Sequence, residues 1–477
     1  MKKKVALHNL GCKVNAYEVE AMQQLLEKAG YEIVPFTEGA DIYLINTCTV
    51  TNIADRKSRQ MLHKAKKMNP DAIVVAAGCY AQADTEKLKE DNAVDLILGN
   101  NQKTQIVEVL EEYEKEHSKQ VQVIEINHTK EYEELSIEQT AEHVRAYIKV
   151  QDGCNQFCTY CIIPFARGRV RSRKIADVLR EVETLASKGY KEVVLTGIHL
   201  SSYGVDFPKE ERESLLSLIQ AVSKVAGIQR IRLGSLEPRI ITEEFLEGIV
   251  ATGKVCPHFH LSLQSGCNKT LKNMNRRYSA QEYAEKCDLI RRYYPAPALT
   301  TDVIVGFPME TEEDFEASYE FVKNIHFYET HIFKYSRRHG TKAAAMDGQL
   351  TEAVKAQRSE KFLALHDIRA KEYEEAMIGK TIELLLEEEI EEDGKNWYVG
   401  HSREYVRAVI KKTDAHQVND LVEAKVTGFL TDHLLRAEYP AGCRTDFRYD
   451  LQGVMPVLTK EFQQKKGSCI LIRIILK

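Results

Sequence analysis

The sequence predicts an α/β protein built from a doubly wound parallel sheet, a partial (β/α)6 barrel and a small β-barrel. Short apolar runs alternate with amphipathic helical segments in two successive blocks, which is the pattern of parallel sheets. Five short strands follow near the C-terminal end, and they predict the small barrel. The length of 477 residues is sufficient for several domains.

The first domain is expected at residues 1–127, as strands that alternate with helices. The expected strands are 5–7, 42–45, 73–77, 96–98 and 121–124. The expected helices are 17–29, 54–68, 83–90 and 105–116. Gly30 ends the first helix and Asn69-Pro70 ends the second, because glycine and proline interrupt helices. This alternation predicts a parallel sheet that helices cover on both faces.

The second domain is expected at residues 144–375, as six strand–helix units in series. The expected strands are 145–150, 192–196, 229–234, 258–263, 298–305 and 329–333. The expected helices are 176–188, 214–225, 242–251, 280–293 and 312–324. Six such units predict a parallel barrel that need not be closed. In such barrels the chemistry lies at the carboxyl ends of the strands.

Two charged stretches, 111–120 and 128–143, are interpreted as a solvated helix end and an interdomain linker rather than as an acidic site. The third domain is expected at residues 378–440. Its expected strands are 382–386, 397–400, 406–410, 421–426 and 434–438. The remaining residues, 441–477, form a tail with an apolar end to which the sequence assigns no role.

The composition is ordinary for a soluble globular protein, with 43% hydrophobic and 29% charged residues. The net charge is −5, so any nucleic-acid contact must use local basic patches. The N-terminal apolar run is too short for a signal peptide, and no apolar stretch approaches the ~20 residues of a membrane helix. With eleven cysteines, these features predict metal-binding or catalytic thiols in the reducing cytoplasm, without membrane attachment.

Three cysteines lie within eight residues of one another, at Cys154, Cys158 and Cys161. Three thiolates on one short loop can hold three corners of a cubane iron–sulfur cluster and leave the fourth iron open. A structural zinc site normally has four ligands in pairs, and no obvious fourth ligand is nearby. A disulfide would leave an odd cysteine. The spacing therefore favours an iron–sulfur cluster.

Three further cysteines, Cys12, Cys48 and Cys79, follow expected strands of the first domain. Parallel strands place their carboxyl ends on one edge of a sheet, where ligands bind. These thiols can therefore converge into a second three-cysteine site, although three independent buried cysteines are the alternative. The other five cysteines are interpreted as ordinary thiols: Cys256, Cys267, Cys287, Cys443 and Cys469.

The order of these six cysteines resembles the methylthiotransferases, a family of radical S-adenosylmethionine (SAM) enzymes with an additional N-terminal cluster domain. The matching motifs are LGCKVN at 10–15, NTCTVTN at 46–52, GCY at 78–80, the cysteine loop at 154–161 and RGRVRSR at 167–173. The resemblance covers roughly residues 3–440. Within the family, GCKVN with NTCTVTN looks most like the group that acts on N6-threonylcarbamoyladenosine.

The resemblance implies two 4Fe–4S clusters and the use of two SAM molecules per turnover. Its cluster ligands are Cys154, Cys158 and Cys161 for the cluster that binds SAM, and Cys12, Cys48 and Cys79 for the second cluster. The residues that it assigns to SAM are Tyr160, Gly197, Ser235, Glu237 and Arg276. No catalytic side chain is expected beyond the cofactors. The family often has Asn where His199 stands.

The implied reaction adds CH3–S to C2 of N6-threonylcarbamoyladenosine next to the anticodon of tRNA. The first cluster would generate the radical that removes the C2 hydrogen, and the second would carry the sulfur that is methylated. The implied partners are tRNA, a reductant protein such as flavodoxin or ferredoxin, and a sulfur donor, with the chain acting as a monomer. Three alternatives stay open: isopentenyladenosine in tRNA, a ribosomal-protein aspartate, and a non-catalytic iron–sulfur sensor that binds RNA.

Two groups of basic residues are candidate RNA contacts. The run after the cysteine loop consists of Arg167, Arg169, Arg171, Arg173 and Lys174. In an extended segment, alternate arginines would point the same way and could hold phosphates; a solvated charged face is the alternative. The third domain resembles the TRAM domain, a small RNA-binding β-barrel. Its candidate contacts, with plain surface charges as the alternative, are His401, Arg403, Arg407, Lys411 and Lys412.

Overall fold

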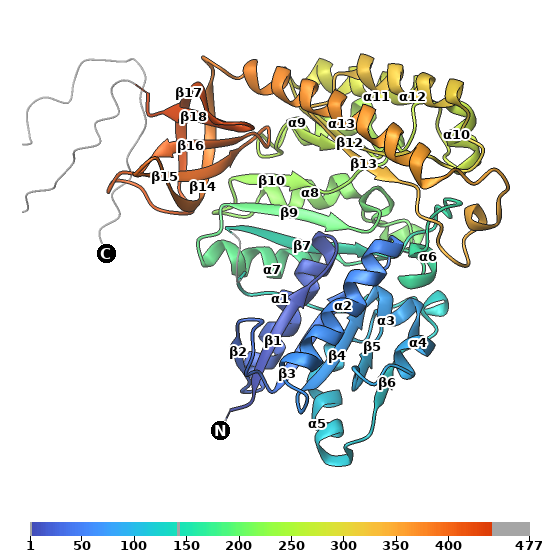
Figure 1. Ribbon diagram of the computed structural model, residues 1–477. Coiled ribbons are helices and arrows are strands. Elements are labelled where there is room, and N and C mark those ends of the chain that lie inside the picture. The colour runs from blue at the N-terminus through green and yellow to red at the C-terminus, as the bar shows by residue number, and fades with distance from the viewer. Residues whose placement is uncertain (1, 141–143, 441–477) are drawn as a thin grey trace, which may run out of the picture.

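The computed structural model describes residues 2–140 and 144–440. A six-stranded sheet domain lies against an open barrel of parallel strands, and a small closed β-barrel lies at one end of the open barrel (Figure 1). This architecture confirms the predicted fold class. In these residues, the structure contains no helix long and apolar enough to span a membrane.

The N-terminal sheet is parallel throughout and has the strand order β2-β1-β3-β4-β5-β6. Its strands are β1 Lys4–Asn9, β2 Glu32–Val34, β3 Ile42–Thr47, β4 Ile73–Gly78, β5 Leu96–Leu98 and β6 Gln120–Gln122. Its helices are α1 Lys13–Lys28, α2 Asn52–Met68, α3 Cys79–Ala83, α4 Thr85–Lys89 and α5 Ile106–Glu116. Helices α1 and α5 pack on one face of the sheet and α2 to α4 on the other. The sequence pattern missed β2 because its three residues are only partly buried.

Helix α1 begins four residues earlier than predicted, so that Cys12 is its N-cap residue. Asn15, Glu18 and Glu20 are buried on this helix, and these polar side chains hide its apolar periodicity. The earlier start brings the thiol of Cys12 to a helix N-terminus, where backbone N–H groups lack helical partners.

The open barrel contains all six predicted strands. They are β7 Arg145–Asp152, β9 Glu192–Gly197, β10 Arg230–Leu233, β11 His258–His260, β12 Ala298–Val305 and β13 Glu329–Lys334. Two hydrogen bonds, Leu236 N to His260 O (2.8 Å) and Ser262 N to Leu236 O (3.0 Å), join the two halves between β10 and β11. A short antiparallel strand, β8 Arg171–Ser172, extends the β7 edge and was not predicted.

Helices surround the outer face of this barrel. They are α6 Ile163–Ala166, α7 Ile175–Ser187, α8 Leu215–Ser223, α9 Glu243–Val250, α10 Asn268–Asn273, α11 Ala280–Tyr293, α12 Glu312–Ile325 and α13 Glu352–Glu375. Short 3-10 turns in the chain lie at 103–105, 126–128, 200–202, 209–211, 238–240 and 342–345. The sequence pattern missed α13, because only scattered positions of this charged helix are buried.

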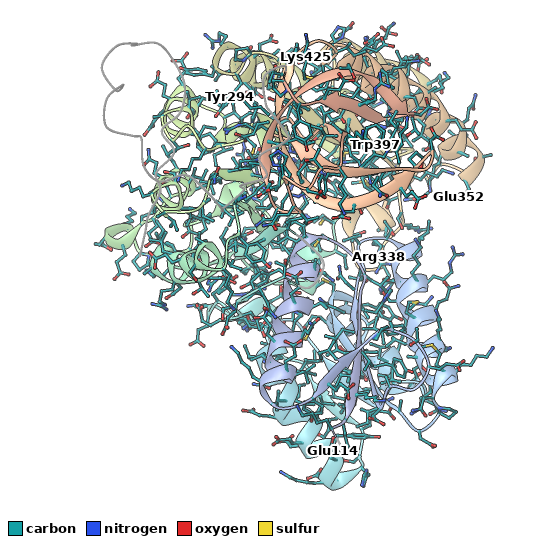
Figure 2. All side chains as sticks on the ribbon, turned by 90° about the vertical axis from the view of Figure 1, so that its left-hand side faces the viewer. Glu114, Tyr294, Arg338, Glu352, Trp397 and Lys425 are labelled. Carbon is teal, nitrogen blue, oxygen red and sulfur yellow. The ribbon has the colours of Figure 1, made fainter. Side chains whose placement is uncertain are left out.

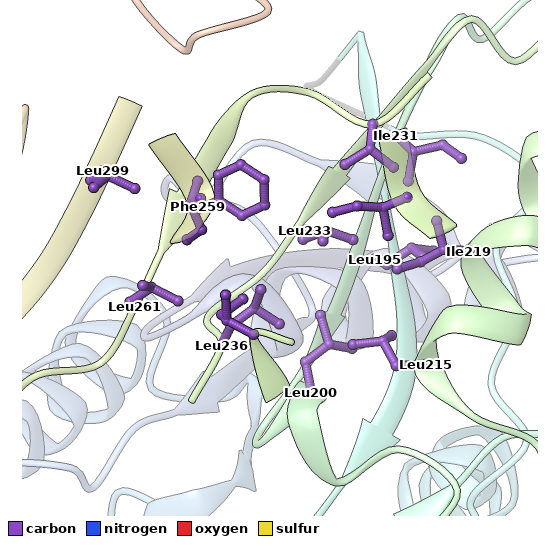
Figure 3. Close-up of a cluster of buried hydrophobic side chains, with 14 of the residues drawn as sticks. Leu195, Leu200, Leu215, Ile219, Ile231, Leu233, Leu236, Phe259, Leu261 and Leu299 are labelled. Atoms are coloured by element: carbon purple, nitrogen blue, oxygen red, sulfur yellow. The ribbon is translucent and has the colours of Figure 1, made fainter. Parts of the chain in front are cut away.

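Side chains alternate strictly between the two faces of the barrel strands. Leu195, Leu233 and Phe259 point outward and pack with helix side chains such as Ile219 (Figure 3). Most of the alternate positions are polar and face the lumen: Lys149, Gln151, Glu192, Arg230, Arg232, His258, His260, Thr300 and Asp302. Because side chains on a strand have a period of two, the same strands build an apolar outer core and a polar interior.

The C-terminal barrel closes in the order β14-β15-β16-β18-β17. Its strands, which match the five predicted, are β14 Thr381–Glu392, β15 Lys395–Ser402, β16 Arg407–Lys411, β17 Leu421–Thr431 and β18 Leu434–Glu438. The turn between β15 and β16 inserts Tyr405 against the open barrel, where its ring stacks on His258 at 4.6 Å between centroids. Arg230 and Arg232 also donate hydrogen bonds to the Ser402 carbonyl (2.8 and 3.1 Å). The small barrel therefore closes the end of the lumen at which the strands begin.

A buried ion network joins the sheet domain to the open barrel. Glu18 on α1 accepts from Lys149 on β7 (2.8 Å), and Lys149 also pairs with Asp152 (2.7 Å). Arg167 bridges both carboxylates, at 2.8 Å from Glu18 and 3.2 Å from Asp152. These side chains are at most 2% exposed. The network fixes the face of α1 that docks on β7.

Residues 128–140 of the predicted linker are docked rather than solvated. Leu135 and Ile137 are buried in the main core, and Tyr17 donates a hydrogen bond to the Leu135 carbonyl (2.6 Å). The sequence predicts an interdomain linker here, and two apolar side chains among its charges dock it on the core. The residues 141–143, and the tail with Cys443 and Cys469, lie outside the described part of the chain.

Replacing Glu18 by Gln is expected to destabilise the chain by about 3–5 kcal/mol, because it leaves buried cations without their carboxylate. Burial raises the pKa of Glu18, but the charges of Arg167, Lys103 and Lys149 hold it well below its usual range. The stabilisation is thus present above about pH 4 and lost below it. Denaturant unfolding measures the change.

The matched control is Glu27→Gln, at an exposed position of the same helix. A Glu18→Gln variant that unfolds at the same denaturant concentration as Glu27→Gln would show that the network does not stabilise the docked domains.

Candidate metal and cofactor site

Cys12, Cys48 and Cys79 line one cavity of about 390 Å³ at the edge of the N-terminal sheet. They follow β1, β3 and β4, three adjacent strands, as the strand-end positions predict. The strand order reverses between β1 and β3, which is where open parallel sheets bind ligands. Burial, together with the charges of Cys79 and Cys12, raises the pKa of Cys48 to about 12. The three thiols are therefore close enough to interact electrostatically.

Two glycines allow the strand ends to approach one another. Gly78 has φ +90°, and a Cβ there would lie 2.2 Å from Asn46 Oδ1. Gly11 has φ +117°, and a Cβ there would lie 3.2 Å from the Cys48 Cβ. Only glycine adopts such backbone conformations without strain. The glycines before Cys12 and Cys79 thus set how closely these strand ends approach Cys48 and Asn46.

Two N–H groups point at the Cys79 sulfur. Arg167 Nε lies 3.1 Å from Cys79 Sγ, and Asn100 Nδ2 lies 3.6 Å from it. Arg167 also donates to Asn15 Oδ1 (2.8 Å), so one guanidinium contacts the thiol and the α1 helix together. Hydrogen bonds to cluster sulfurs tune the reduction potential of iron–sulfur sites. Sequence reasoning missed Asn100, which has no motif around it.

The RNA-binding prediction for Arg167, Arg171 and Arg173 is wrong, because these side chains are 0–3% exposed. Arg171 donates to the Arg167 carbonyl (3.0 Å), and Arg173 pairs with Glu181. The alternation points them into the domain junction, where carboxylates compensate their charge. Of the run, Arg169 is partly exposed, and its guanidinium lies 4.5 Å from the Phe157 ring centroid.

The loop after Cys48 is clamped to the open barrel from the other side. Arg338 donates to Thr49 Oγ1 and to Asn52 Oδ1, both at 2.7 Å, and also pairs with Asp55. Figure 2 shows Arg338 at the boundary between the N-terminal domain and the rest of the molecule. Together with Arg167, it fixes the cysteine cavity relative to the barrel.

The loop with the second three thiols leaves the carboxyl end of β7. Its start is pinned by the bond from Cys154 N to Gly168 O (3.0 Å), and its middle by Thr159 Oγ1, which donates to Asn273 O (2.8 Å). Burial raises the pKa of Cys154 to about 11 and that of Cys161 to about 12. Such thiols bind metal only by releasing their protons, as iron and zinc sites require.

The residues assigned to SAM lie around this loop. Arg276 Nη1 lies 3.4 Å from Cys158 Sγ, and Tyr160 lines an adjacent cavity of about 200 Å³. Glu237 is buried and pairs with Arg239 (2.6 Å), whereas Ser235 is exposed. A Cβ on Gly197 would lie 2.9 Å from Gln151 Cβ, so a glycine is required there.

His199 also belongs to this region. Burial, with the charges of Arg276 and Arg239, lowers its pKa to about 4, so the imidazole is neutral at physiological pH. Its Nδ1 bonds Ser202 Oγ (2.7 Å), and its buried Nε2 has no partner among the described residues. An orphaned polar atom beside three soft thiolate donors fits a polar cofactor bound at an iron–sulfur cluster.

The cavities of the two thiol groups share two lining residues. Val50 and Ile163 line both cavities, one of which contains Cys12, Cys48 and Cys79 and the other Cys161. Val50 follows Cys48 by two residues, and Ile163 follows Cys161 by two residues. The two cavities therefore adjoin each other at Val50 and Ile163.

The lumen contains polar residues that sequence reasoning did not connect. His260, Asp302 and His331 lie together, with His260 Nε2 3.3 Å from Asp302 Oδ2 and the two imidazole rings 5.6 Å apart. Their positions alternate with apolar residues along three neighbouring strands. That period of two was the signal that could have found them.

Two of the candidate RNA contacts in the small barrel are occupied by contacts within the protein. His401 bonds Glu387 (2.9 Å) and stacks on Tyr405, and Arg403 donates to the carbonyls of Gly253 and Val255, both at 3.1 Å. The prediction is wrong for these two, because they build the junction with the open barrel. The remaining candidates lie on the outer surface of the barrel or at its edge: Arg407, Lys411 and Lys412.

Two family models match the chain: "Uncharacterized protein family UPF0004" over residues 4–99 and "Radical SAM superfamily" over residues 148–322. Threonylcarbamoyladenosine tRNA methylthiotransferase MtaB of Bacillus subtilis is 40% identical, over 91% of this chain and 94% of the relative. The MtaB of Aquifex aeolicus is 44% identical, over 81% and 93%. The tRNA-2-methylthio-N(6)-dimethylallyladenosine synthase of Thermoanaerobacter pseudethanolicus is 37% identical, over 80% and 81%.

Among solved structures, the fold is similar to the radical S-adenosylmethionine methyltransferase TsrM from Kitasatospora setae, solved with cobalamin and a [4Fe-4S] cluster bound. The TM-score is 0.52 at 15% identity, over 72% of this chain and 74% of that chain. At this identity the similarity shows the fold alone.

Arg276→Gln is expected to weaken SAM binding about 10- to 100-fold, because a charged hydrogen bond contributes roughly 1.5–3 kcal/mol. Equilibrium binding of SAM to iron-reconstituted protein measures the effect. Arg277→Gln, at the exposed neighbouring position, is the control. Equal SAM affinity in both variants would show that Arg276 does not contact SAM.

Proposed function

This chain belongs to the radical SAM methylthiotransferases, and we propose that it adds a methylthio group to C2 of N6-threonylcarbamoyladenosine next to the anticodon of tRNA. Whichever nucleoside is the target, the chain is a radical SAM tRNA methylthiotransferase that uses an iron–sulfur cluster and SAM. The proposal concerns the target nucleoside and a second cluster.

The observation that carries the proposal is the pair of three-cysteine groups on either side of Val50 and Ile163. Generation of a radical requires one cluster, whereas insertion of sulfur requires a second site that can hold sulfur close to the same substrate atom. Two open cysteine sites at one shared wall meet this requirement.

Each thiol group has its own supporting contacts. Cys154, Cys158 and Cys161 would hold the cluster that binds SAM, beside Arg276 and the free His199 Nε2. When bound, cluster and SAM supply the one-electron chemistry that removes hydrogen from an aromatic carbon. Val50 and Ile163 line both cavities and Ile304 lines the one with Cys161, so the space between the sites has apolar side chains on its surface.

The second cluster would be held by Cys12, Cys48 and Cys79. Arg167 and Asn100 donate toward the Cys79 sulfur, which favours the negative charge of a thiolate ligand. The thiols lie at strand ends and helix starts, so their positions do not depend on a mobile loop.

The threonylcarbamoyl target is supported by the relatives. Two relatives named MtaB are 44% and 40% identical to this chain; two further MtaB relatives are 35% identical, and the relatives named for dimethylallyladenosine are 37% identical. Arg169 and Lys411 are candidate contacts for tRNA phosphates, as are Arg407 and Lys412, which pair with Glu388 and Glu389 at the barrel surface. A reductant protein and a sulfur donor complete the proposed set of partners.

Cys12→Ala is expected to abolish methylthiolation while SAM cleavage to 5′-deoxyadenosine continues, because only the second cluster loses a ligand. Iron analysis should fall from about eight irons per chain toward about four, the content of one 4Fe–4S cluster. Loss of both activities would mean that Cys12 is not confined to the sulfur-bearing site. Cys256→Ala, a buried thiol outside both cavities, is the control.

The target is tested by mass spectrometry of tRNA nucleosides from cells that lack the gene. We expect 2-methylthio-N6-threonylcarbamoyladenosine to disappear and the unmethylthiolated nucleoside to accumulate. If the methylthio-isopentenyl nucleoside disappears instead, isopentenyladenosine is the target.

A further inference from the structure

Side chains from all three domains gather positive charge at the closed end of the barrel lumen, around the Tyr405 ring. The guanidinium of Arg232 lies 4.8 Å from the ring centroid and that of Arg145 lies 5.3 Å from it. The His258 ring stacks on it at 4.6 Å. Lys13, at the start of α1, reaches the same ring, with Nζ at 5.9 Å.

The carboxylates nearest this end are held by the arginines, including Glu383 at 4.0 Å from Arg230, and Glu329 interacts with Lys13 only electrostatically, without an ion-pair contact. Glu192 is shared by Arg230 and Arg232, at 2.8 Å from each Nε, and Arg145 has one carboxylate partner on the small barrel. Lys13 has neither a hydrogen bond nor an ion pair among residues 2–140 and 144–440. A partly buried ammonium without a counter-ion is a site for an anion.

The inner faces of β12 and β13 connect the lumen with the cavity at the cysteine loop. Asp302 pairs in register with His331, and Ile304 with Phe333, so all four side chains share the inner face. Three of them line the cavity that also contains Cys161. His331 and Phe333 are exposed although they face the interior, which shows free space there.

We propose that Lys13 binds the carboxylate of the threonylcarbamoyl group and thereby selects the target nucleoside. This inference rests on the proposed function. Lys13 directly follows Cys12 in the sequence. The start of α1 therefore presents both a thiol of the sulfur-bearing site and an ammonium to the same substrate. An adenine whose C2 faces the thiols directs its N6 substituent into the remaining lumen, where Lys13 lies.

Other anions of the reaction are excluded by position. The SAM carboxylate belongs at the opposite end of the lumen, with Arg276 beside Cys158. The phosphates of tRNA cannot enter past Tyr405, which fills the closed end between His258 and Arg232. A carboxylate on the base itself is the anion that reaches Lys13.

The experiment compares two substrates and two enzymes in the full, iron-reconstituted chain with SAM and reductant. The substrates are anticodon stem-loop RNAs that carry N6-threonylcarbamoyladenosine or its carboxamide, in which a neutral amide replaces the carboxylate. The enzymes are the native chain and Lys13→Gln. Lys28→Gln, at the far exposed end of the same helix, is the matched control.

We expect native enzyme and Lys28→Gln to prefer the carboxylate about 10- to 100-fold in kcat/KM. Lys13→Gln should lose this preference while iron content and SAM cleavage stay as in the native chain, and Lys13→Arg should restore it. A native enzyme that uses both RNAs equally, or a Lys13→Gln variant that keeps the preference, overturns the inference alone. A native enzyme inactive on both RNAs but active on isopentenyladenosine overturns the proposed function with it.

Discussion

The structure depends on one buried set of charges, in which Arg167 lies between Glu18 and Asp152. Charges are tolerated in a protein interior only where partners compensate them, so these side chains accept a single arrangement of the two domains. Arg167 also points its Nε at the Cys79 sulfur, 3.1 Å away. The contact that docks the N-terminal domain thus also sets the electrostatics of its cysteine cavity. The position of the N-terminal domain on the open barrel and the position of its cysteine cavity therefore depend on the same side chain, Arg167.

The polar lumen explains why three domains are needed for one site. The open barrel supplies the strands, but it is open along one side and at its starting end. The N-terminal domain covers the side and brings Cys12 and Lys13 to the interior. The small barrel closes the end with Tyr405. Its role in this chain therefore includes completing the lumen, in addition to any contact with RNA.

Much of the fold was predictable, because strand and helix periods are local properties of the sequence. The six barrel strands and the five strands of the small barrel lie where the apolar runs predict them. The errors share one cause. The arginine run and His401 were judged as candidate RNA contacts on the surface, but each is covered by a distant part of the chain. Local composition contains no information about that burial.

The sequence by itself identified the six cysteines of both thiol groups as candidates, since their spacing and strand-end positions mark them. Only the tertiary structure decided how those groups face each other and what lies between them. Val50 and Ile163 come from segments more than a hundred residues apart, and they meet because Arg167 and Arg338 clamp two domains together. The same holds for Lys13, whose ammonium reaches Tyr405 across two domain boundaries. These contacts between domains depend on how complete domains dock, and no local pattern in the sequence specifies that docking.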